Sequence, residues 1–245
     1  MVFSLAAQGE NVVVRFWSLA EQILEAVGRN DTSVAIVHIA GALLSILLAY
    51  LLGSINPAVL ISRVFYKDDI RRHGSKNAGT TNMLRTYGKG AAVATFALDL
   101  SKAALAVLLG LWIWGFNGRA LAGFFVVFGH MFPIFHRFNG GKGVACLAMV
   151  VLLISPITFA FLLAIFLVGA IGTRMVSFGS MMAALLYPLI LQAFYTVPDL
   201  SVAMAVLCAV FVVFAHRENI KRIRTGTEHK IELSKLFGKS GKDKK

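Results

Sequence analysis

The sequence predicts an all-α integral membrane protein with seven transmembrane helices. Of its 245 residues, 58% are hydrophobic and only 15% are charged, whereas soluble globular domains carry about 25% charged residues. The mean hydropathy is +0.75, and a soluble core of this size could not bury so much apolar surface. Several uncharged runs reach the ~20 residues that cross a bilayer as a helix. These observations exclude a soluble globular protein, but they leave a net charge of +12 to be explained.

Residues 1–33 form an N-terminal extension before the first apolar run. Apolar residues recur at helical spacing between Val12 and Val27, which predicts an amphipathic helix lying on the membrane surface. An extension without a role of its own is the alternative. Charged residues interrupt the segment and no apolar core precedes them, so it does not have the pattern of a signal peptide.

The membrane domain, residues 34–216, is inferred from runs in which charged residues are absent or rare. These runs are Thr32–Ser62, Gly90–Gly118, Ala120–His136, Gly143–Thr173, Met175–Pro198 and Leu200–His216. As one helix, Gly143–Thr173 would be about 46 Å long, well beyond the ~30 Å hydrocarbon core. Ser155-Pro156 lies near its middle, where a turn is favoured.

The positions of the cations decide between one span and two in that run. With a turn at Ser155-Pro156 there are seven spans, and the polar segments 63–89, 136–142, 173–177 and 216–245 share one side. They hold seven, two, one and ten Lys and Arg residues, which is 20 of the 24 in the chain. Because positively charged loops stay in the cytoplasm, we predict an external N-terminus, a cytoplasmic C-terminus, and short helices or re-entrant segments in the cytoplasmic loops.

The basic tail, residues 217–245, explains much of the net charge. It contains ten cations and four acids, a composition suited to anchoring on anionic lipids of the bilayer. Its first part, up to about residue 230, is expected to contribute to the functional site. Some of the remaining cations lie in loop motifs whose particular sequences are not needed to orient the protein in the membrane.

The first cytoplasmic loop contains an unusual density of hydrogen-bond donors. Glycines, hydroxyl residues, asparagines and cations alternate there, and the candidate phosphate-binding residues are Ser75, Asn77, Gly79, Thr81, Asn82 and Arg85. Glycine lets successive N–H groups point one way, and an arginine can bind a phosphate through two parallel hydrogen bonds. This composition predicts a phosphate site, and an ordinary solvated loop is the alternative.

A second candidate anion site is the Gly140-Gly141-Lys142-Gly143 turn at the start of a span. Free N–H groups, the positive end of a helix dipole and a lysine would meet there. The spacing lacks the four residues that separate Gly from Gly-Lys-Ser/Thr in a nucleotide-binding P-loop. The alternative is a flexible hairpin between two spans.

Further polar residues lie at the same predicted interface. They are Ser177 at the start of the sixth span, His216 and Asn219 at the end of the seventh, and Glu228 in the tail. Asp99 and Lys102 stand three residues apart inside the second span, so they can pair on one helical face. We interpret them as a structural pair, with a direct substrate role as the second possibility.

Taken together, these motifs resemble the bacterial acyl-phosphate:glycerol-3-phosphate acyltransferase family (PlsY). The resemblance runs from about Ala49 to Lys230. Its marks are Gly53-Ser54 closing the first span, the Gly74–Arg85 loop, Asp99-x-x-Lys102, Gly129-His130-x-Phe132-Pro133, Gly140–Ala145, and His216–Arg222 with Gly226-x-Glu228. It implies seven spans with the site on the cytoplasmic side of a bacterial inner membrane.

The resemblance also implies a reaction. Such enzymes transfer a fatty acyl group from acyl phosphate to the first (sn-1) hydroxyl of glycerol 3-phosphate, giving lysophosphatidate and phosphate, the first step of phospholipid synthesis. Ser75, Asn77 and Thr81 would hold the donor phosphate. Glycerol 3-phosphate would be bound by Arg85, Lys142, Ser177, His216 and Asn219, and Glu228 would position the cations. The candidate catalytic residues are His216, Ser75 and Lys142. His216 is the candidate general base, and an oxygen of the donor phosphate is the alternative proton acceptor.

Other functional classes lack their motifs in this sequence. No metal-ligand cluster is visible, so we expect no cofactor and no metal, and we expect no nucleic-acid partner. A transporter or channel for a small anion is the main alternative, although transport sites usually lie at the membrane midplane rather than at one interface. We expect the protein to act as a monomer.

Overall fold

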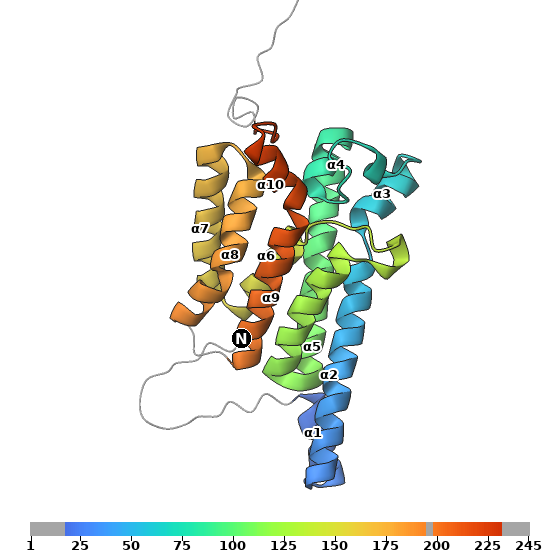
Figure 1. Cartoon of the computed structure of the whole chain (residues 1–245). Coiled ribbons are helices and arrows are strands. Elements are labelled where there is room, and N and C mark those ends of the chain that lie inside the picture. The colour runs from blue at the N-terminus through green and yellow to red at the C-terminus, as the bar shows by residue number, and fades with distance from the viewer. Residues whose placement is uncertain (1–17, 195–197, 232–245) are drawn as a thin grey trace, which may run out of the picture.

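The computed structural model describes residues 18–194 and 198–231, and within them the fold is helical throughout (Figure 1). The helices are α1 Leu19–Val27, α2 Asp31–Ser54, α3 Pro57–Phe65, α4 Thr80–Tyr87, α5 Lys89–Met131, α6 Val144–Ile154, α7 Pro156–Thr173, α8 Val176–Phe194, α9 Asp199–Ala215 and α10 Arg217–Arg224, with 3₁₀ turns η1 Ile70–Arg72 and η2 Ile134–His136. In this part of the chain, four helical segments are long and apolar enough to cross a membrane, or five if α9 and α10, which meet at 53°, form one bent span. The predicted all-α membrane protein is therefore confirmed.

The long helix α5 is in fact a helical hairpin. Its backbone leaves the helical range at Trp114 and Gly115, where Gly115 takes a φ of +60°. The arms on either side then pack so closely that a Cβ on Gly118 would lie 2.1 Å from the carbonyl oxygen of Gly110. The second and third apolar runs are thus separate antiparallel arms. The chain reverses at Trp114–Gly115 and not at the predicted boundary after Gly118, because Gly115 can adopt a positive φ that other residues disfavour.

The charge-free run Thr32–Ser62 is not one continuous helix, and α2 ends at the Gly53-Ser54 pair that the family resemblance implies for the end of the first span. Helix α2 ends at Ser54, and the side chain of Asn56 accepts a hydrogen bond from the N–H of Val59 to cap the next helix. Pro57 occupies the first turn of α3, where its missing N–H removes no helical hydrogen bond. The chain therefore turns out of the direction of α2 before the first polar loop begins (Figure 1).

The run Gly143–Thr173 breaks where the sequence predicts. Helix α6 ends at Ile154 and α7 begins at Pro156. Between them, the hydroxyl of Ser155 accepts a hydrogen bond of 3.1 Å from the N–H of Thr158 and so caps α7. The Ser-Pro pair thus ends one helix and starts the next.

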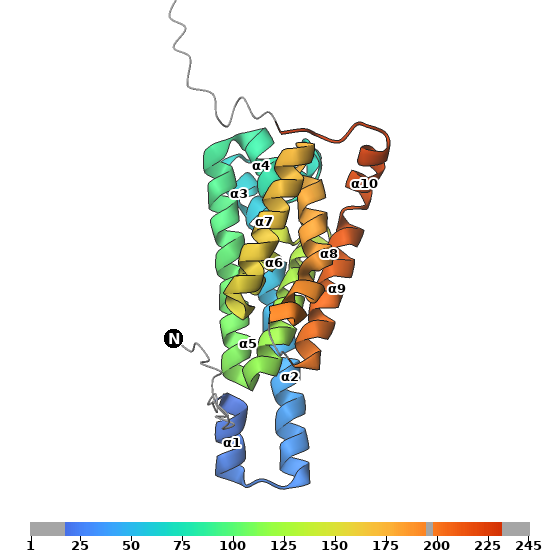
Figure 2. The same ribbon diagram turned by 90° about the vertical axis from the view of Figure 1, so that its left-hand side faces the viewer.

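Helix α1 packs against the start of α2 and forms a hairpin with it. Asn30 caps α2 through a reciprocal pair of hydrogen bonds with Ser33, and Ala20 and Leu24 of α1 are buried. Figures 1 and 2 show this hairpin projecting beyond the end of the bundle where α5 reverses. Residues 12–17 of the predicted surface helix lie outside the described part of the chain.

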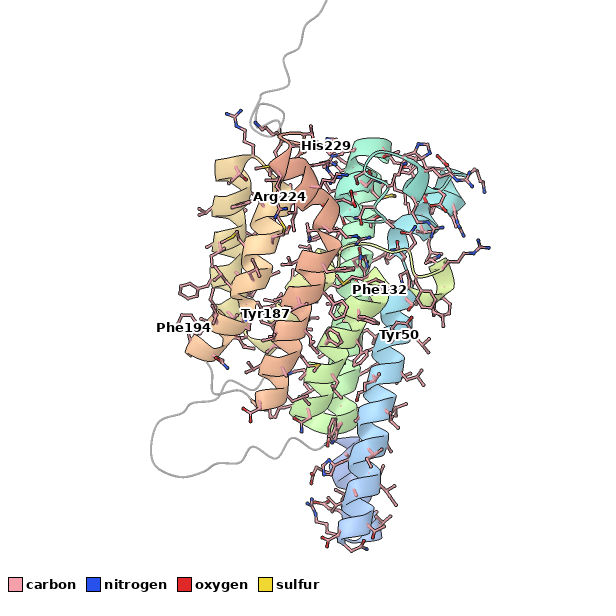
Figure 3. All side chains as sticks on the ribbon, viewed as in Figure 1. Tyr50, Phe132, Tyr187, Phe194, Arg224 and His229 are labelled. Atoms are coloured by element: carbon pink, nitrogen blue, oxygen red, sulfur yellow. The ribbon has the colours of Figure 1, made fainter. Side chains whose placement is uncertain are left out.

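The polar segments gather at the opposite end of the bundle. Helices α3, α4 and α10 and the α7–α8 junction all lie there (Figure 1), so the structure places the cation-rich loops together. After α10 the chain crosses this end of the bundle toward α7 (Figure 2), and the N–H of Ile231 donates to the carbonyl of Arg174 at 2.6 Å. Deeper in the bundle, the Tyr50 hydroxyl donates to the carbonyl of Phe132 at 3.0 Å and joins α2 to the end of α5 (Figure 3).

Candidate active site

The polar motifs line one cavity of about 390 Å³ at this end of the bundle. Of the predicted site residues, those in its wall are Ser75, Asn77, Gly79, Thr81, Asn82, Arg85, Lys142, Gly143, Ser177, His216, Asn219 and Glu228. They come from the loop before α4, from α4 itself, and from the starts or ends of α6, α8, α9 and α10. Segments more than a hundred residues apart in the sequence therefore form a single site.

The loop before α4 is shaped by two buried asparagines. Asn82 accepts a hydrogen bond from the N–H of Ser75 at 3.0 Å and donates to the carbonyls of Ile70 and His73. Asn56 donates to the carbonyl of Ala78 at 3.3 Å. These bonds hold the loop with the first turn of α4 facing the cavity, where N–H groups at a helix start favour an anion. Asn82 thus organises the loop from within as well as lining the cavity.

The Gly140–Gly143 turn packs tightly on the end of α5. A Cβ on Gly140 would lie 2.1 Å from the carbonyl oxygen of His130, and one on Gly141 would lie 2.1 Å from Nε2 of the same histidine. Neither glycine is part of the cavity wall. Their lack of a side chain lets the turn approach His130 and brings Lys142 and Gly143 to the cavity. Any direct contact of Gly140 or Gly141 with a substrate stays a prediction.

Glu228 is the centre of the polar network on the far wall. Its carboxylate accepts hydrogen bonds of 2.6 Å from the Ser177 hydroxyl, 2.6 Å from the Asn219 amide and 2.8 Å from Nε of Arg222. Asn219 in turn accepts a hydrogen bond from Nζ of Lys142. The tail segment after α10 is therefore fixed to α8 and to the Gly140–Gly143 turn.

The network carries more positive than negative charge. Arg85, Lys142 and Arg222 lie within electrostatic reach of one another and of Glu228. Burial lowers the pKa of Lys142 to about 8, an effect that Glu228 partly opposes. Burial alone would raise the pKa of Glu228, but hydrogen bonds from Ser177, Asn219 and Arg222 hold it below its usual value. Three cations and one carboxylate leave an excess that suits a phosphate dianion.

His216 has a fixed tautomer. Its Nδ1 lies 2.7 Å from the carbonyl oxygen of Val212, and because a carbonyl can only accept, Nδ1 must carry the proton. Nε2 of the neutral ring then has a free lone pair. The ring is buried and lines the cavity, so His216 has the chemistry of a general base.

The cavity continues from the polar groups into the apolar interior. Its lower wall is formed by side chains of α6, α7 and α8, namely Leu147, Ala148, Val151, Phe159, Leu162, Leu163, Phe166, Ala183 and Ala184. None of these can hydrogen-bond through its side chain, so this part favours an alkyl chain. One cavity therefore offers an anion site and an apolar channel to the same ligand.

Comparison with known proteins identifies the family. Residues 43–226 match the family described as glycerol-3-phosphate acyltransferase. The chain is 40% identical over 190 residues to the glycerol-3-phosphate acyltransferase of Thermoanaerobacter pseudethanolicus, covering 78% of this chain and 96% of that protein. The Streptococcus thermophilus protein of that name is 40% identical over 211 residues, covering 82% and 99%. The chain belongs to the glycerol-3-phosphate acyltransferase family.

Solved structures agree with this assignment. The fold is similar to that of PlsY, an integral membrane glycerol 3-phosphate acyltransferase, in its glycerol 3-phosphate form, with a TM-score of 0.74 and 36% identity over 80% of this chain and 98% of that one. The lysophosphatidic acid form gives a TM-score of 0.72 at 35% identity over the same shares. The predicted resemblance is confirmed.

This acyltransferase also contains a buried ionic cluster beside the cavity. Nζ of Lys102 lies 3.0 Å from a carboxylate oxygen of Asp99 and 2.9 Å from Nδ1 of His130. It also donates to the carbonyls of Gly53 and Ile55, at 3.1 and 2.6 Å, at the end of α2. The predicted Asp99–Lys102 pair is therefore real, and Lys102 also satisfies carbonyls that the end of α2 leaves free.

Asp99, His130 and Cys146 offer ligand atoms within 4.8 Å of one another, as a metal site would. Lys102 fills the position that a cation would take between Asp99 and His130. In this acyltransferase the Lys102 ammonium group supplies the positive charge that Asp99 and His130 contact. The expectation that the enzyme needs no metal stays a prediction.

Some residues of the acyltransferase cavity were not among the predicted site residues. They are Thr80, Asp99, His130, Arg222 and His229, together with the apolar channel. Arg222 follows Asn219 by one helical turn, so the spacing on α10 could have revealed it. Asp99, His130 and Thr80 lie in motifs that the sequence analysis singled out, but their place in the cavity wall, like that of His229, depends on packing between distant segments.

Proposed function

We propose that this enzyme transfers a fatty acyl group from acyl phosphate to the sn-1 hydroxyl of glycerol 3-phosphate, giving lysophosphatidate and phosphate. The observation that carries the proposal is the cavity itself. It joins a polar end with an excess of positive charge to an apolar channel, which suits a phosphate head group joined to an alkyl chain. The named relatives support the acceptor, and the apolar channel supports an acyl donor.

The two head groups would occupy opposite walls of the polar end. Ser75, Asn77 and Thr81, with the backbone around Gly79 at the start of α4, would hold the donor phosphate. Arg85 and Lys142 would bind the phosphate of glycerol 3-phosphate, next to Asn219. Ser177, Asn219 and Arg222 all bond Glu228, which supports a role for Glu228 in positioning the cations.

Acyl phosphate is a mixed anhydride with a good leaving group, so the reaction needs no covalent enzyme nucleophile. The glycerol hydroxyl oxygen forms a bond to the acyl carbon, and the bond from that carbon to the phosphate oxygen breaks. The hydroxyl proton passes either to Nε2 of His216 or to an oxygen of the donor phosphate. The cationic side chains of Arg85 and Lys142 would stabilise the negative charge that develops as the tetrahedral centre forms.

In the membrane, we propose seven spans made of α2, the two arms of α5, and α6 to α9. The concentration of cations at the cavity end supports a cytoplasmic active site and C-terminus, an external N-terminus and a bacterial inner membrane. Residues 217–245 would contact anionic lipids, and residues 1–33 would form a separate extension. We also propose that the protein acts as a monomer.

The activity test uses purified protein with palmitoyl phosphate and labelled glycerol 3-phosphate. We expect labelled lysophosphatidate to form without added metal. Product formed only with acyl-CoA would overturn the proposed donor. Unchanged label crossing the membrane of a reconstituted vesicle, with no product, would favour the transporter.

Cysteine labelling tests the topology. Cys146 and Cys208 are buried, so cysteines introduced at the exposed residues Ala26, in the α1–α2 hairpin, and Lys221, on α10, can be labelled selectively. A membrane-impermeant maleimide should reach the first only from outside and the second only from the cytoplasmic side. Labelling of both from one side would contradict the seven-span arrangement.

A further inference from the structure

A second polar hollow of about 510 Å³ lies outside the active site, on the side of the bundle. It is bounded by the end of α3 and η1 on one side and by η2 on the other. Figure 1 shows the chain between α5 and α6 projecting from the bundle below α3. Four arginines line the hollow: Arg63, Arg71, Arg72 and Arg137. None of them is part of the active-site cavity wall.

Two of these arginines are already engaged. Arg71 forms hydrogen bonds of 2.9 and 2.7 Å with the two carboxylate oxygens of Asp69, and Arg63 contacts the same carboxylate at 3.0 Å. The Arg71 side chain holds the pKa of Asp69 well below its usual range, so this single acid is ionised. One carboxylate against four guanidinium groups leaves a strong positive excess in the hollow.

Arg72 and Arg137 are exposed and form no ion pair within the described residues. Arg137 is held in the left-handed region with a φ of +55°, which side chains other than Gly, Asn and Asp rarely adopt. The tight turn after η2 therefore keeps the Arg137 backbone in an unfavourable conformation at the rim of the hollow. Strain of this kind often marks a ligand site.

His136 gives an independent indication of a ligand. Its side chain lines the hollow and the residue is only 9% exposed. Its Nδ1 is buried and has no hydrogen-bond partner in the described structure. A buried polar nitrogen without a partner is unfavourable, and a ligand oxygen in the hollow would satisfy it.

Exposed aromatic side chains belong to the hollow or lie next to its lining residues in the chain. Phe135 lines the hollow and is 60% exposed. Phe138, also 60% exposed, follows Arg137 directly, and Phe65, 75% exposed, follows Arg63 by two residues. In an integral membrane protein, such aromatic side chains beside arginines are typical of the boundary between acyl chains and head groups. A soluble anion would need no such aromatic side chains.

We propose that this hollow binds the phosphate of an anionic phospholipid from the surrounding leaflet. Arg72, Arg137 and His136 contact the phosphate, and Phe135 and Phe138 contact the acyl chains. Arg71 also donates to the backbone carbonyls of His136 and Asn139, at 3.0 and 3.4 Å. It therefore ties η1 to the turn that carries Lys142, so a bound lipid stabilises the join between two walls of the active site.

The test measures binding of dioctanoyl phosphatidylglycerol to the protein in neutral detergent by native mass spectrometry. The pocket variant is Arg72→Gln with Arg137→Asn, since Asn tolerates a positive φ. Its control, Lys221→Gln with Arg224→Gln, removes two exposed cations elsewhere at the same end of the bundle. We expect the pocket variant to bind the lipid about 30-fold more weakly, as follows from the usual contribution of two basic residues. The control should change binding less than twofold.

Other measurements separate this site from its alternatives. Lys142→Ala should keep the lipid affinity, since the active site is separate, and the lipid should raise the midpoint of thermal unfolding in wild type but not in the pocket variant. Equal losses in the pocket variant and its control would show attraction by bulk charge alone. Full displacement of the lipid by an equal concentration of inorganic phosphate would show a site for free phosphate. Either result, or unchanged binding by the pocket variant, overturns the proposal.

Discussion

Two clusters of charge lie close together in this molecule and are built differently: the first is buried, whereas the cations of the second are partly buried or exposed. In the first, Lys102 lies between Asp99, His130 and two backbone carbonyls at the end of α2. In the second, Arg85, Lys142 and Arg222 surround the single carboxylate of Glu228. Both clusters contribute side chains to the cavity wall. The first pairs Asp99 with Lys102 inside the protein, whereas the second has cations in excess over its one carboxylate.

The difference indicates which charged residues hold the fold and which hold substrate. A buried ion that is fully paired leaves nothing for a ligand, and its loss strands its partner in a medium of low dielectric. An unbalanced cluster is repulsive until an anion arrives, so it favours the substrate over the empty site. Substitutions in the two clusters should therefore have opposite effects on stability and on activity.

The largest effect is expected for Lys102→Met. The substitution keeps the length of the side chain but leaves Asp99 without its ammonium partner, which costs about 3–5 kcal/mol in other buried pairs. The free energy of unfolding, measured in detergent, should fall by about that amount. Lys89→Met removes an exposed lysine from the same helix and should change it by less than about 0.5 kcal/mol. Equal stability of the two variants would show that the first cluster is not structural.

Lys142→Ala should show the reverse pattern. Removing one charged donor aimed at the reacting groups lowers activity by about 10²–10³-fold, so kcat/KM for glycerol 3-phosphate should fall by that factor. The thermal midpoint should stay level or rise, because repulsion by Arg85 and Arg222 is relieved. Lys221→Ala, an exposed lysine on α10, is the control and should keep full activity. An unfolded Lys142→Ala protein would contradict the distinction between the clusters.

The sequence reveals these clusters to different degrees. Asp99 and Lys102 stand three apart in an apolar run, so their pairing follows from helical geometry alone. That Lys102 also bonds the carbonyls of Gly53 and Ile55 could not be predicted, because it depends on how α2 packs against α5. In the same way, the donor-rich motifs identified most of the polar part of the cavity wall, but not that Asn82 organises its own loop or that Gly140 and Gly141 pack on His130.

Helix boundaries show a similar limit. Ser155 caps a helix and Pro156 is best tolerated in the first turn of one, so these two adjacent residues are enough to predict the break between α6 and α7. The end of α2 at Ser54 agrees with the Gly53-Ser54 pair of the family resemblance, but hydrophobicity alone does not indicate it, because apolar residues continue to Ser62 beyond the turn capped by Asn56. The reversal at Gly115 depends on a positive φ and on the close approach of Gly110 to Gly118, which a count of charged residues cannot locate.

A pH profile should give a more moderate effect in the unbalanced cluster. Burial lowers the pKa of Lys142 to about 8, so its charge is present below that pH and is lost as the pH rises through it. The value of kcat/KM for glycerol 3-phosphate, which reports the free enzyme, should therefore fall about tenfold per pH unit above about 8. Lys142→Arg keeps its charge at high pH and should remove this decline, even if its activity is lower throughout. A wild-type profile that stays flat to pH 10 would contradict a role for the charge of Lys142.

Glu228→Gln should have the smallest effect on activity. It tests whether the one carboxylate of the second cluster stabilises the charged form of Lys142. The substitution keeps the shape of the side chain but removes the negative charge that opposes the lowering of the pKa of Lys142. The decline of kcat/KM should therefore begin at a lower pH than in wild type, with a modest loss near pH 7, where most Lys142 is still charged. Glu218→Gln, an exposed acid on α10 outside the cavity wall, should leave the profile unchanged. A shift toward higher pH in Glu228→Gln would show that Glu228 does not stabilise the charged form of Lys142, and the second cluster would then depend on its other members for the binding of phosphate.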